Sequence, residues 1–92
     1  MCVEGCTLAD DRIHRVTIRR TADSVRAEAE VTLSDSVRTL TSSGVGVRDA
    51  DAVSLKAAED AQLSEIRRQL YAVGFSKRAI ASAVRDLTRE RD

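Results

Sequence analysis

The stretch VRAEAEVTL, residues 25–33, decides the fold because its apolar and polar side chains alternate without interruption. In an extended chain the apolar residues share one side and the others the opposite side: Val25, Ala27, Ala29, Val31 and Leu33 against Arg26, Glu28, Glu30 and Thr32. Strict alternation is typical of an antiparallel strand with one face on a core and the other in water. In a helix the same apolar positions would spread around the whole surface. The stretch therefore predicts a half-buried strand.

The segments on either side of this strand predict two further strands. Residues 12–20 read as a strand in which alternation places His14 on the same face as Val16 and Ile18. Polar turns at residues 21–24 and 34–36 separate it from its neighbours. Residues 37–47 read as a third strand, with a bulge or bend at 42–44. Residues 12–48 thus predict a three-stranded antiparallel meander.

Two helices are expected after the meander. The first covers residues 49–73, is capped by Asp49 or Asp51, and carries an apolar stripe of Leu55, Leu63, Ile66, Leu70 and Val73. Glu59 falls close to the middle of that stripe. Either the first turns overhang the core, which we expect, or a buried carboxylate meets an Arg or His14. Gly74 ends this helix, and a shorter helix, residues 76–90, follows before a frayed tail at 89–92.

The predicted fold class is therefore α+β: a three-stranded antiparallel sheet packed by a long helix and followed by a shorter C-terminal helix. The chain of 92 residues fits one domain, residues 12–92, behind a flexible N-terminus, residues 1–11. The core is thin, because Phe75 and Tyr71 are the only aromatics and most apolar residues are Ala or Val. A homodimer, which would bury more apolar surface, is one expectation.

The charges cancel overall but alternate in blocks along the chain. Residues 12–26 carry five Arg against one Asp, residues 49–65 one Lys against five acids, and residues 66–92 seven bases against three acids. Such blocks suit docking to a partner of mixed charge, including a second copy of the chain. Chance clustering on a solvated surface is the alternative.

The cellular setting expected from the sequence is the cytoplasm. No stretch reaches the roughly 18 apolar residues that span a bilayer, and residues 1–6 lack the basic and apolar regions of a signal peptide. Cys2 and Cys6 are expected to be reduced thiols. Together with His14 they could offer three metal ligands, but a structural zinc site needs four. We expect no metal and no cofactor.

Residues suited to catalysis are scarce, which favours a binding protein over an enzyme. His14 is the only histidine, and nothing in the spacing gives it a nucleophile and an orienting group. Gly44-Val45-Gly46 is too short for a phosphate-binding loop, and no Lys-Ser/Thr pair follows it. We expect no enzymatic activity and no small-molecule substrate.

One resemblance covers about residues 12–73, and the run that shows it is residues 26–70, RAEAEVTLSDSVRTLTSSGVGVRDADAVSLKAAEDAQLSEIRRQL. This run resembles the second half of a double-stranded-RNA-binding domain, and its layout is similar to the core of single-strand-annealing recombinases. The resemblance implies a β-β-β-α layout and nucleic-acid binding. Such RNA-binding domains place a Lys cluster at the start of the last helix, where this chain has Asp49, Asp51 and only Lys56. The departure implies that the fold is shared and the nucleic-acid ligand is lost.

A second resemblance lies within residues 66–88. The run IRRQLYAVGFSKRAIASAVRDL resembles a helix–turn–helix of the ubiquitin-associated type, or the C-terminal domain of a Holliday-junction helicase subunit. In those families the Gly-aromatic turn and the last helix contact other proteins. The resemblance implies such contacts for Gly74, Phe75 and Leu87.

Two functional hypotheses follow. The first is a small non-enzymatic regulatory protein that acts through protein contacts, as a phage-type inhibitor or adaptor does. The alternative is nucleic-acid binding through phosphates, since guanidinium groups pair with carboxylates and phosphates alike, although the strands carry no aromatic for base stacking. The candidate partner-binding residues are Arg12, Arg15, Arg19, Arg20, Arg26, Arg67, Arg68, Phe75, Lys77 and Arg78.

Overall fold

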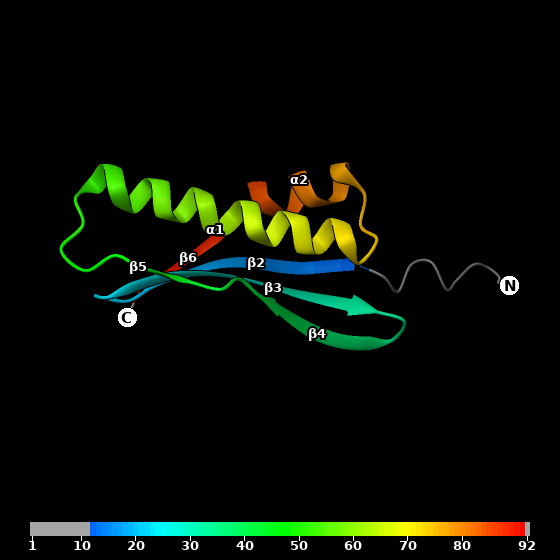
Figure 1. Cartoon of the computed structure of the whole chain (residues 1–92). Helices are drawn as coiled ribbons and strands as arrows, with labels where there is room; N and C mark the ends of the chain where they lie inside the picture. The colour runs from blue at the N-terminus through cyan, green and yellow to red at the C-terminus, as the bar shows by residue number, and fades with distance from the viewer. Residues whose placement is uncertain (1–11, 92) are drawn as a thin grey trace, which may run out of the picture.

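The computed structural model describes residues 12–91, which form a sheet covered on one face by two helices (Figure 1). The elements in chain order are β2 Arg12–Arg20, β3 Ser24–Leu33, β4 Ser36–Thr41, β5 Val45–Gly46, α1 Ala52–Ala72, α2 Lys77–Arg85 and β6 Thr88–Arg91. The predicted α+β class, with a long helix and a shorter one packed on a sheet, is confirmed. The N-terminal segment 1–11, with Cys2 and Cys6, lies outside the described residues.

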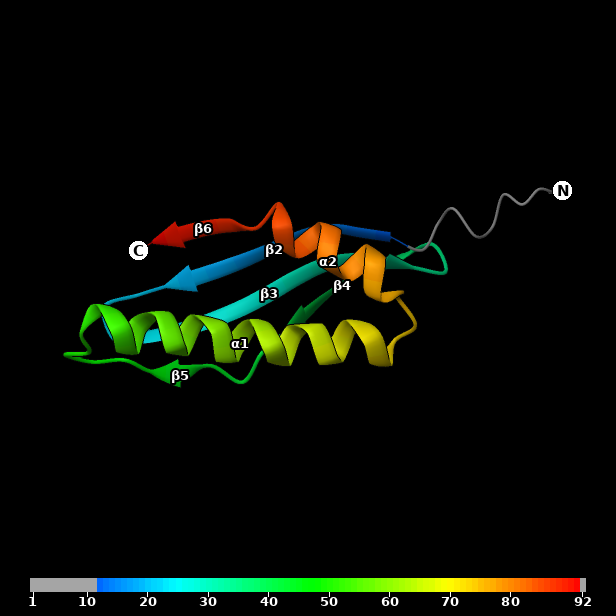
Figure 2. The same cartoon turned by 90° about the horizontal axis from the view of Figure 1, so that it is seen from above.

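The sheet is mixed, with the strand order β4-β3-β2-β6 and with β5 paired to β3 (Figure 2). β2 pairs with β3 and β3 pairs with β4 in antiparallel fashion, as the meander predicts. β6 adds to the free side of β2 in parallel. A parallel pair requires a long crossover connection, which α1 and α2 supply on a single face of the sheet.

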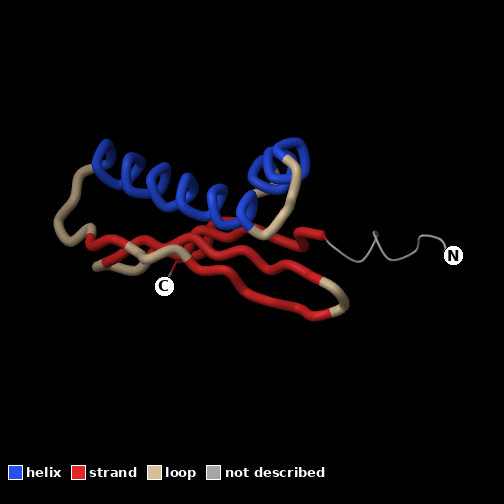
Figure 3. The backbone as a smooth tube through the Cα atoms, turned by 45° about the vertical axis from the view of Figure 1, so that its right-hand side comes forward, coloured by secondary structure: helices blue, strands red, loops and turns tan. Residues whose placement is uncertain are grey.

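The core lies between β2, β3 and the helices, so the molecule has two layers (Figure 3). The alternating side of β3 is completely buried, as predicted from residues 25–33: Val25, Ala27, Ala29 and Val31. Val16 and Ile18 of β2 stand opposite Ala29 and Ala27 and extend the same apolar face. α1 covers this face with Leu63, Ile66 and Leu70. Small side chains on the sheet let the larger helical ones approach closely, which raises packing density.

The third predicted strand is interrupted between β4 and β5, at the bulge expected from Ser42-Ser43-Gly44. The Ser42 N–H donates to the Ala27 carbonyl at 2.9 Å, and the Ser42 hydroxyl accepts the Ala27 N–H at 2.9 Å, in place of a backbone carbonyl. Gly44 has a φ of +84°, a region open to glycine but strained for other residues. Its N–H donates to Gln62 of α1 at 2.9 Å. The bulge is therefore fixed by hydrogen bonds to both β3 and α1.

The C-terminal end differs from the sequence expectation. The second helix ends at Arg85 instead of continuing to residue 90, and residues 88–91 form β6 instead of fraying. Thr17 pairs with Thr88 and Arg19 with Glu90. The sequence TRER has no apolar alternation that would mark a strand. It becomes one because the unpaired backbone groups along β2 offer hydrogen bonds that a frayed tail would leave to water.

Glu59 faces the sheet and is only 7% exposed, so the expected overhang is wrong at this position. Its two carboxylate oxygens bind different arginines: Oε2 lies 3.0 Å from Arg20 Nη1, and Oε1 lies 3.4 Å from Arg89 Nε. A buried carboxylate is tolerated when it is paired and hydrogen-bonded. Since Arg20 belongs to β2 and Arg89 to β6, this cluster ties α1 to both strands.

His14 is also placed differently from the expectation. The register between β2 and β3 shifts between Ile13 and Arg15, so a bulge interrupts the alternation there. Ile13, not His14, packs partly buried against the core. His14 is exposed, and its Nε2 shares a hydrogen bond with the Thr32 hydroxyl. The predicted place of His14 on the buried face is wrong because a β-bulge adds one residue to the strand. Residues before the bulge therefore point to the opposite face from the one that simple alternation predicts.

Replacing Glu59 by alanine tests the buried cluster. We expect Glu59→Ala to lower the free energy of unfolding by about 2 kcal/mol, below the usual range for a buried pair because both arginines are partly exposed. Equilibrium urea denaturation measures the change. The matched control is Glu30→Ala, which removes an exposed ion pair with Arg15 at 3.8 Å and should cost about 0.5 kcal/mol or less. Equal losses in the two variants would contradict a structural role for Glu59.

Candidate functional site

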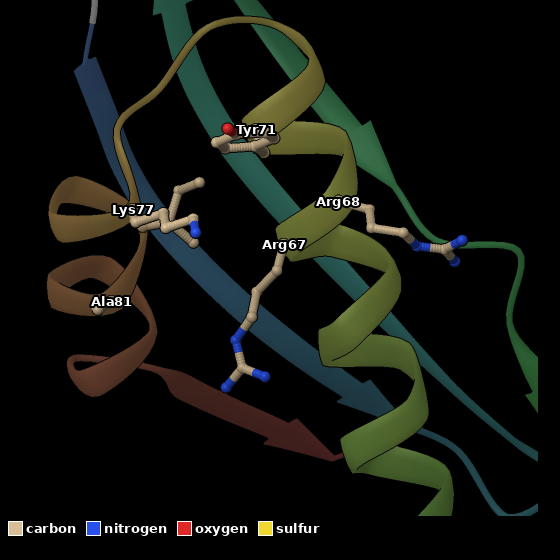
Figure 4. Close-up of a pocket in the computed structure, with 6 residues that line it drawn as sticks. Arg67, Arg68, Tyr71, Lys77 and Ala81 are labelled. Atoms are coloured by element: carbon tan, nitrogen blue, oxygen red, sulfur yellow. The ribbon is translucent and has the colours of Figure 1, made fainter.

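A groove runs between α1 and α2 on the outer surface of the helical layer (Figure 4). Its volume is about 320 Å³, and its walls combine cationic and apolar side chains from both helices: Arg67, Arg68, Tyr71, Lys77, Ile80 and Ala81. Apolar clefts with a few convergent polar groups are the usual form of a binding site. The groove is therefore the candidate functional site.

The turn between the helices positions the two walls. Gly74, at a φ of +114°, ends α1, and the Ser76 hydroxyl caps α2 by accepting the Ala79 N–H at 3.1 Å. α2 then runs back beside α1, so that Lys77 and Arg67 border the same space (Figure 4). Ile80 is 5% exposed and forms the apolar floor, whereas Tyr71 is 60% exposed. The groove therefore joins the core at its base and solvent at its rim.

The electrostatic character of the groove is positive. Three of its lining residues are cations and none is an acid. Arg67 and Lys77 form no ion pair with any other residue of the described segment 12–91. A groove with unpaired cations attracts acidic side chains, more strongly where water is partly excluded.

Glu65 is the acid beside Arg68, and it is already engaged elsewhere. Its carboxylate accepts the Ser43 hydroxyl at 2.9 Å and the Ser43 N–H at 2.8 Å. The hydroxyl hydrogen bond, followed by the N–H and the charge of Arg68, lowers the pKa of Glu65 below its ordinary value. The carboxylate thus stays ionised and directed toward the β4–β5 bulge, on the side of α1 away from α2 (Figure 4 shows Arg68 on that side).

The hairpin arginines do not form one basic face. Arg12, Arg15, Arg19 and Arg26 share the register of the helix-free face of the sheet, but Arg20 points to the other side and binds Glu59. On the helix-free face, Arg15 lies 3.8 Å from Glu30. Arg19 lies 3.0 Å from Glu28 and 3.5 Å from Glu90. Cross-strand pairs therefore neutralise much of the charge that the sequence analysis assigned to a partner.

The other candidate residues divide between the groove and the rest of the fold. Arg67 and Lys77 come together at the groove, Arg68 borders it but points to the other side of α1 (Figure 4), and Arg78 is not part of its lining. Phe75 is 8% exposed and belongs to the core, so little of its side chain is accessible to a partner. The sequence analysis missed Tyr71, Ile80 and Ala81 as groove residues. An aromatic directly after the buried Leu70, outside the apolar stripe of α1, was the available signal for Tyr71.

His14 lies in a second cleft, of about 490 Å³, between β2 and α2. The charged residues around it have both signs: Arg12, Arg15 and Asp86. His14 hydrogen-bonds the Thr32 hydroxyl, and no carboxylate among residues 12–91 forms an ion pair with its ring. Among residues 12–91, no cluster of three or more His, Cys, Asp or Glu residues could hold a metal ion. The proposed ligands Cys2 and Cys6 lie outside the described residues.

Comparisons with known proteins give no match to a protein-family model, a curated protein or a solved structure. In the described part of the chain, neither helix combines the length and the apolar character needed to cross a membrane. The function is therefore argued from the site itself.

The hydrogen bonds of Glu65 predict a pH dependence of stability. A carboxylate whose folded pKa lies below its unfolded value stabilises the fold above the unfolded pKa, which is near 4.5, and loses this contribution as the pH falls through the folded pKa. We therefore expect Glu65→Gln to unfold at a lower temperature than the wild type at pH 7, with the difference shrinking toward pH 3. Thermal unfolding followed by circular dichroism at several pH values measures this. A constant difference between the two proteins would refute the pKa shift as its cause.

Proposed function

We propose that this chain is a non-enzymatic protein-interaction module, acting in the cytoplasm, whose contact surface is the groove between α1 and α2. The observation that carries the proposal is the contrast between its two charged surfaces. Among residues 12–91, Arg15 and Arg19 on the sheet face are matched by glutamates and Arg12 and Arg26 are not, whereas in the groove neither Arg67 nor Lys77 has an acidic partner. Unmatched charge next to an apolar floor supports binding of another molecule.

The chemistry of the groove favours an acidic, amphipathic helical segment as its ligand. The floor at Ile80 and Ala81 suits an apolar anchor, and the cations on both walls suit carboxylates on either side of that anchor. Arginine and tyrosine are enriched among the residues that contribute most to protein–protein binding energy, and both are present here. A helix laid in the groove would cover Tyr71, which is otherwise 60% exposed.

Nucleic-acid binding is supported less well by the same surfaces. The N-terminus of α1 is occupied by its own cap, because the Asp51 carboxylate accepts the Ser54 N–H at 2.8 Å. That hydrogen bond lowers the pKa of Asp51, so a negative charge stands where a phosphate would otherwise bind. The sheet face offers alternating charges and no aromatic side chain. A protein partner is therefore our proposal, and nucleic acid becomes an outcome of its test.

Affinity capture from an extract of the native host tests the proposal. We expect tagged wild-type protein to retain at least one protein in nuclease-treated extract, and the double variant Tyr71→Ala, Lys77→Glu to lose it, because this variant removes the exposed aromatic and reverses a charge at the rim. The matched control is Arg26→Glu, a charge reversal on the opposite face, which should retain the protein.

Two results would count against the proposal. If the captured material disappears after nuclease treatment, with binding that falls steeply with salt, the nucleic-acid alternative is favoured. If all three proteins capture the same partner, the groove is not the contact surface.

A further inference from the structure

The outer face of α1 is divided into two halves of opposite character. Residues spaced by three or four along the helix share this face, and all of them are exposed. The N-terminal half is small and mostly apolar, with one carboxylate at Asp60: Val53, Ala57, Asp60, Ala61 and Ser64. The C-terminal half is basic and aromatic: Arg67, Arg68 and Tyr71.

We infer that the groove-bearing face binds a second copy of this chain, with the two α1 helices antiparallel. The inference rests on the proposed function, since it uses the outer face of α1 that borders the groove and names the molecule that covers it. The ligand proposed for the groove is a helical segment with an apolar anchor and carboxylates, and the N-terminal half of α1 presents small apolar residues beside Asp60. In a two-fold symmetric interface each half of one α1 meets the other half of its partner, so that one pairing satisfies both copies.

One register of the antiparallel pair matches both charge and size. It places Asp60 of one copy opposite Arg68 of the other, Ala57 opposite Tyr71, and Ser64 on the two-fold axis. Asp60 forms no ion pair with another residue of the described part of the chain, so its carboxylate is available. Opposing a small residue to a large one allows the helices to interdigitate, and alanine and serine at the centre allow close approach.

The exposure of apolar residues on α1 supports the same arrangement. Val53 is 77% exposed and Tyr71 is 60% exposed, at opposite ends of the same helical face. In an antiparallel pair, Val53 lies near the C-terminal end of the partner's α1 and Tyr71 near its N-terminal end. Both side chains are then shielded from water by the partner. Charge agrees as well, because the exposed Asp60 lies on one half of this face and the exposed Arg67 and Arg68 lie on the other. A chain of zero net charge has no overall repulsion between copies.

Charge-swap complementation tests this inference. The wild-type protein should show a dimer mass that dissociates on dilution, measured by light scattering with size exclusion and by sedimentation equilibrium. Asp60→Lys sets lysine against Arg68 at two symmetric places, and Arg68→Glu sets glutamate against Asp60 in the same way. We expect each variant alone to dimerise about tenfold more weakly or worse, since like charges in an interface oppose association. An equimolar mixture of the two variants should regain the dimer, because both contacts are then between opposite charges.

The control variant is again Arg26→Glu, on the face of the sheet away from the helices, which should dimerise like the wild type. A wild type that remains monomeric at roughly 100 µM, well above micromolar affinity, would overturn the inference, and so would a dimer that both charge reversals leave unchanged. These results are separable from the proposed function. If the wild type is a monomer but captures another protein, and the capture depends on Tyr71 and Lys77, then only the inference of a second copy is refuted. If the mixture of the two charge variants regains the dimer but no other protein is captured from the extract, then only the proposal of a different protein as partner is refuted.

Discussion

The burial of one face of β3 beneath α1 is the contact on which the other elements depend. Val25, Ala27, Ala29 and Val31 are fully buried, and β3 is the strand that pairs with β2, β4 and β5. Ile66 and Leu70 of α1 lie over it and are fully buried too. Because alanine and valine contribute little apolar area each, the helix must approach closely for the core to stabilise the fold. That requirement explains why Ile66 and Leu70 of α1 face the smaller alanine and valine side chains of β3.

Hydrogen bonds supply the specificity that such a core lacks. Apolar packing is nondirectional, so it fixes the distance between α1 and the sheet better than the helix's position along it. Three polar side chains on one edge of α1 fix that position by binding the β4–β5 region: Gln62, Glu65 and Gln69. Near its N-terminal end, the buried Glu59 joins α1 to Arg20 and Arg89. Bonds on both sides of the helix hold it in one place over the sheet.

The same fold separates two kinds of charged surface. Cross-strand pairing brings Arg15 and Arg19 next to glutamates, and exposed pairs of this kind add little stability but leave little net charge. The helical layer has no comparable arrangement around Arg67 and Lys77 within the described residues. Counting arginines along the sequence therefore makes the sheet look like a better binding surface than it is. The same count gives too little weight to the groove, where cations from two helices lie above an apolar floor.

The sequence by itself determined the local elements: the alternating strand at 25–33, the bulge at 42–44, the long helix and the turn at Gly74. Each depends on residues close together in the chain, whose periodicity and backbone preference are local properties. Only the tertiary structure decided the rest. β6 forms because β2 has a free edge, Glu59 is buried because Arg20 and Arg89 reach it, and the shift at His14 follows from pairing with β3. The groove exists because the turn at Gly74 brings Lys77 back beside Arg67. β6, the Glu59 cluster and the shift at His14 depend on groups far apart in the chain, whose meeting no local pattern encodes, and the groove depends on how α2 packs beside α1.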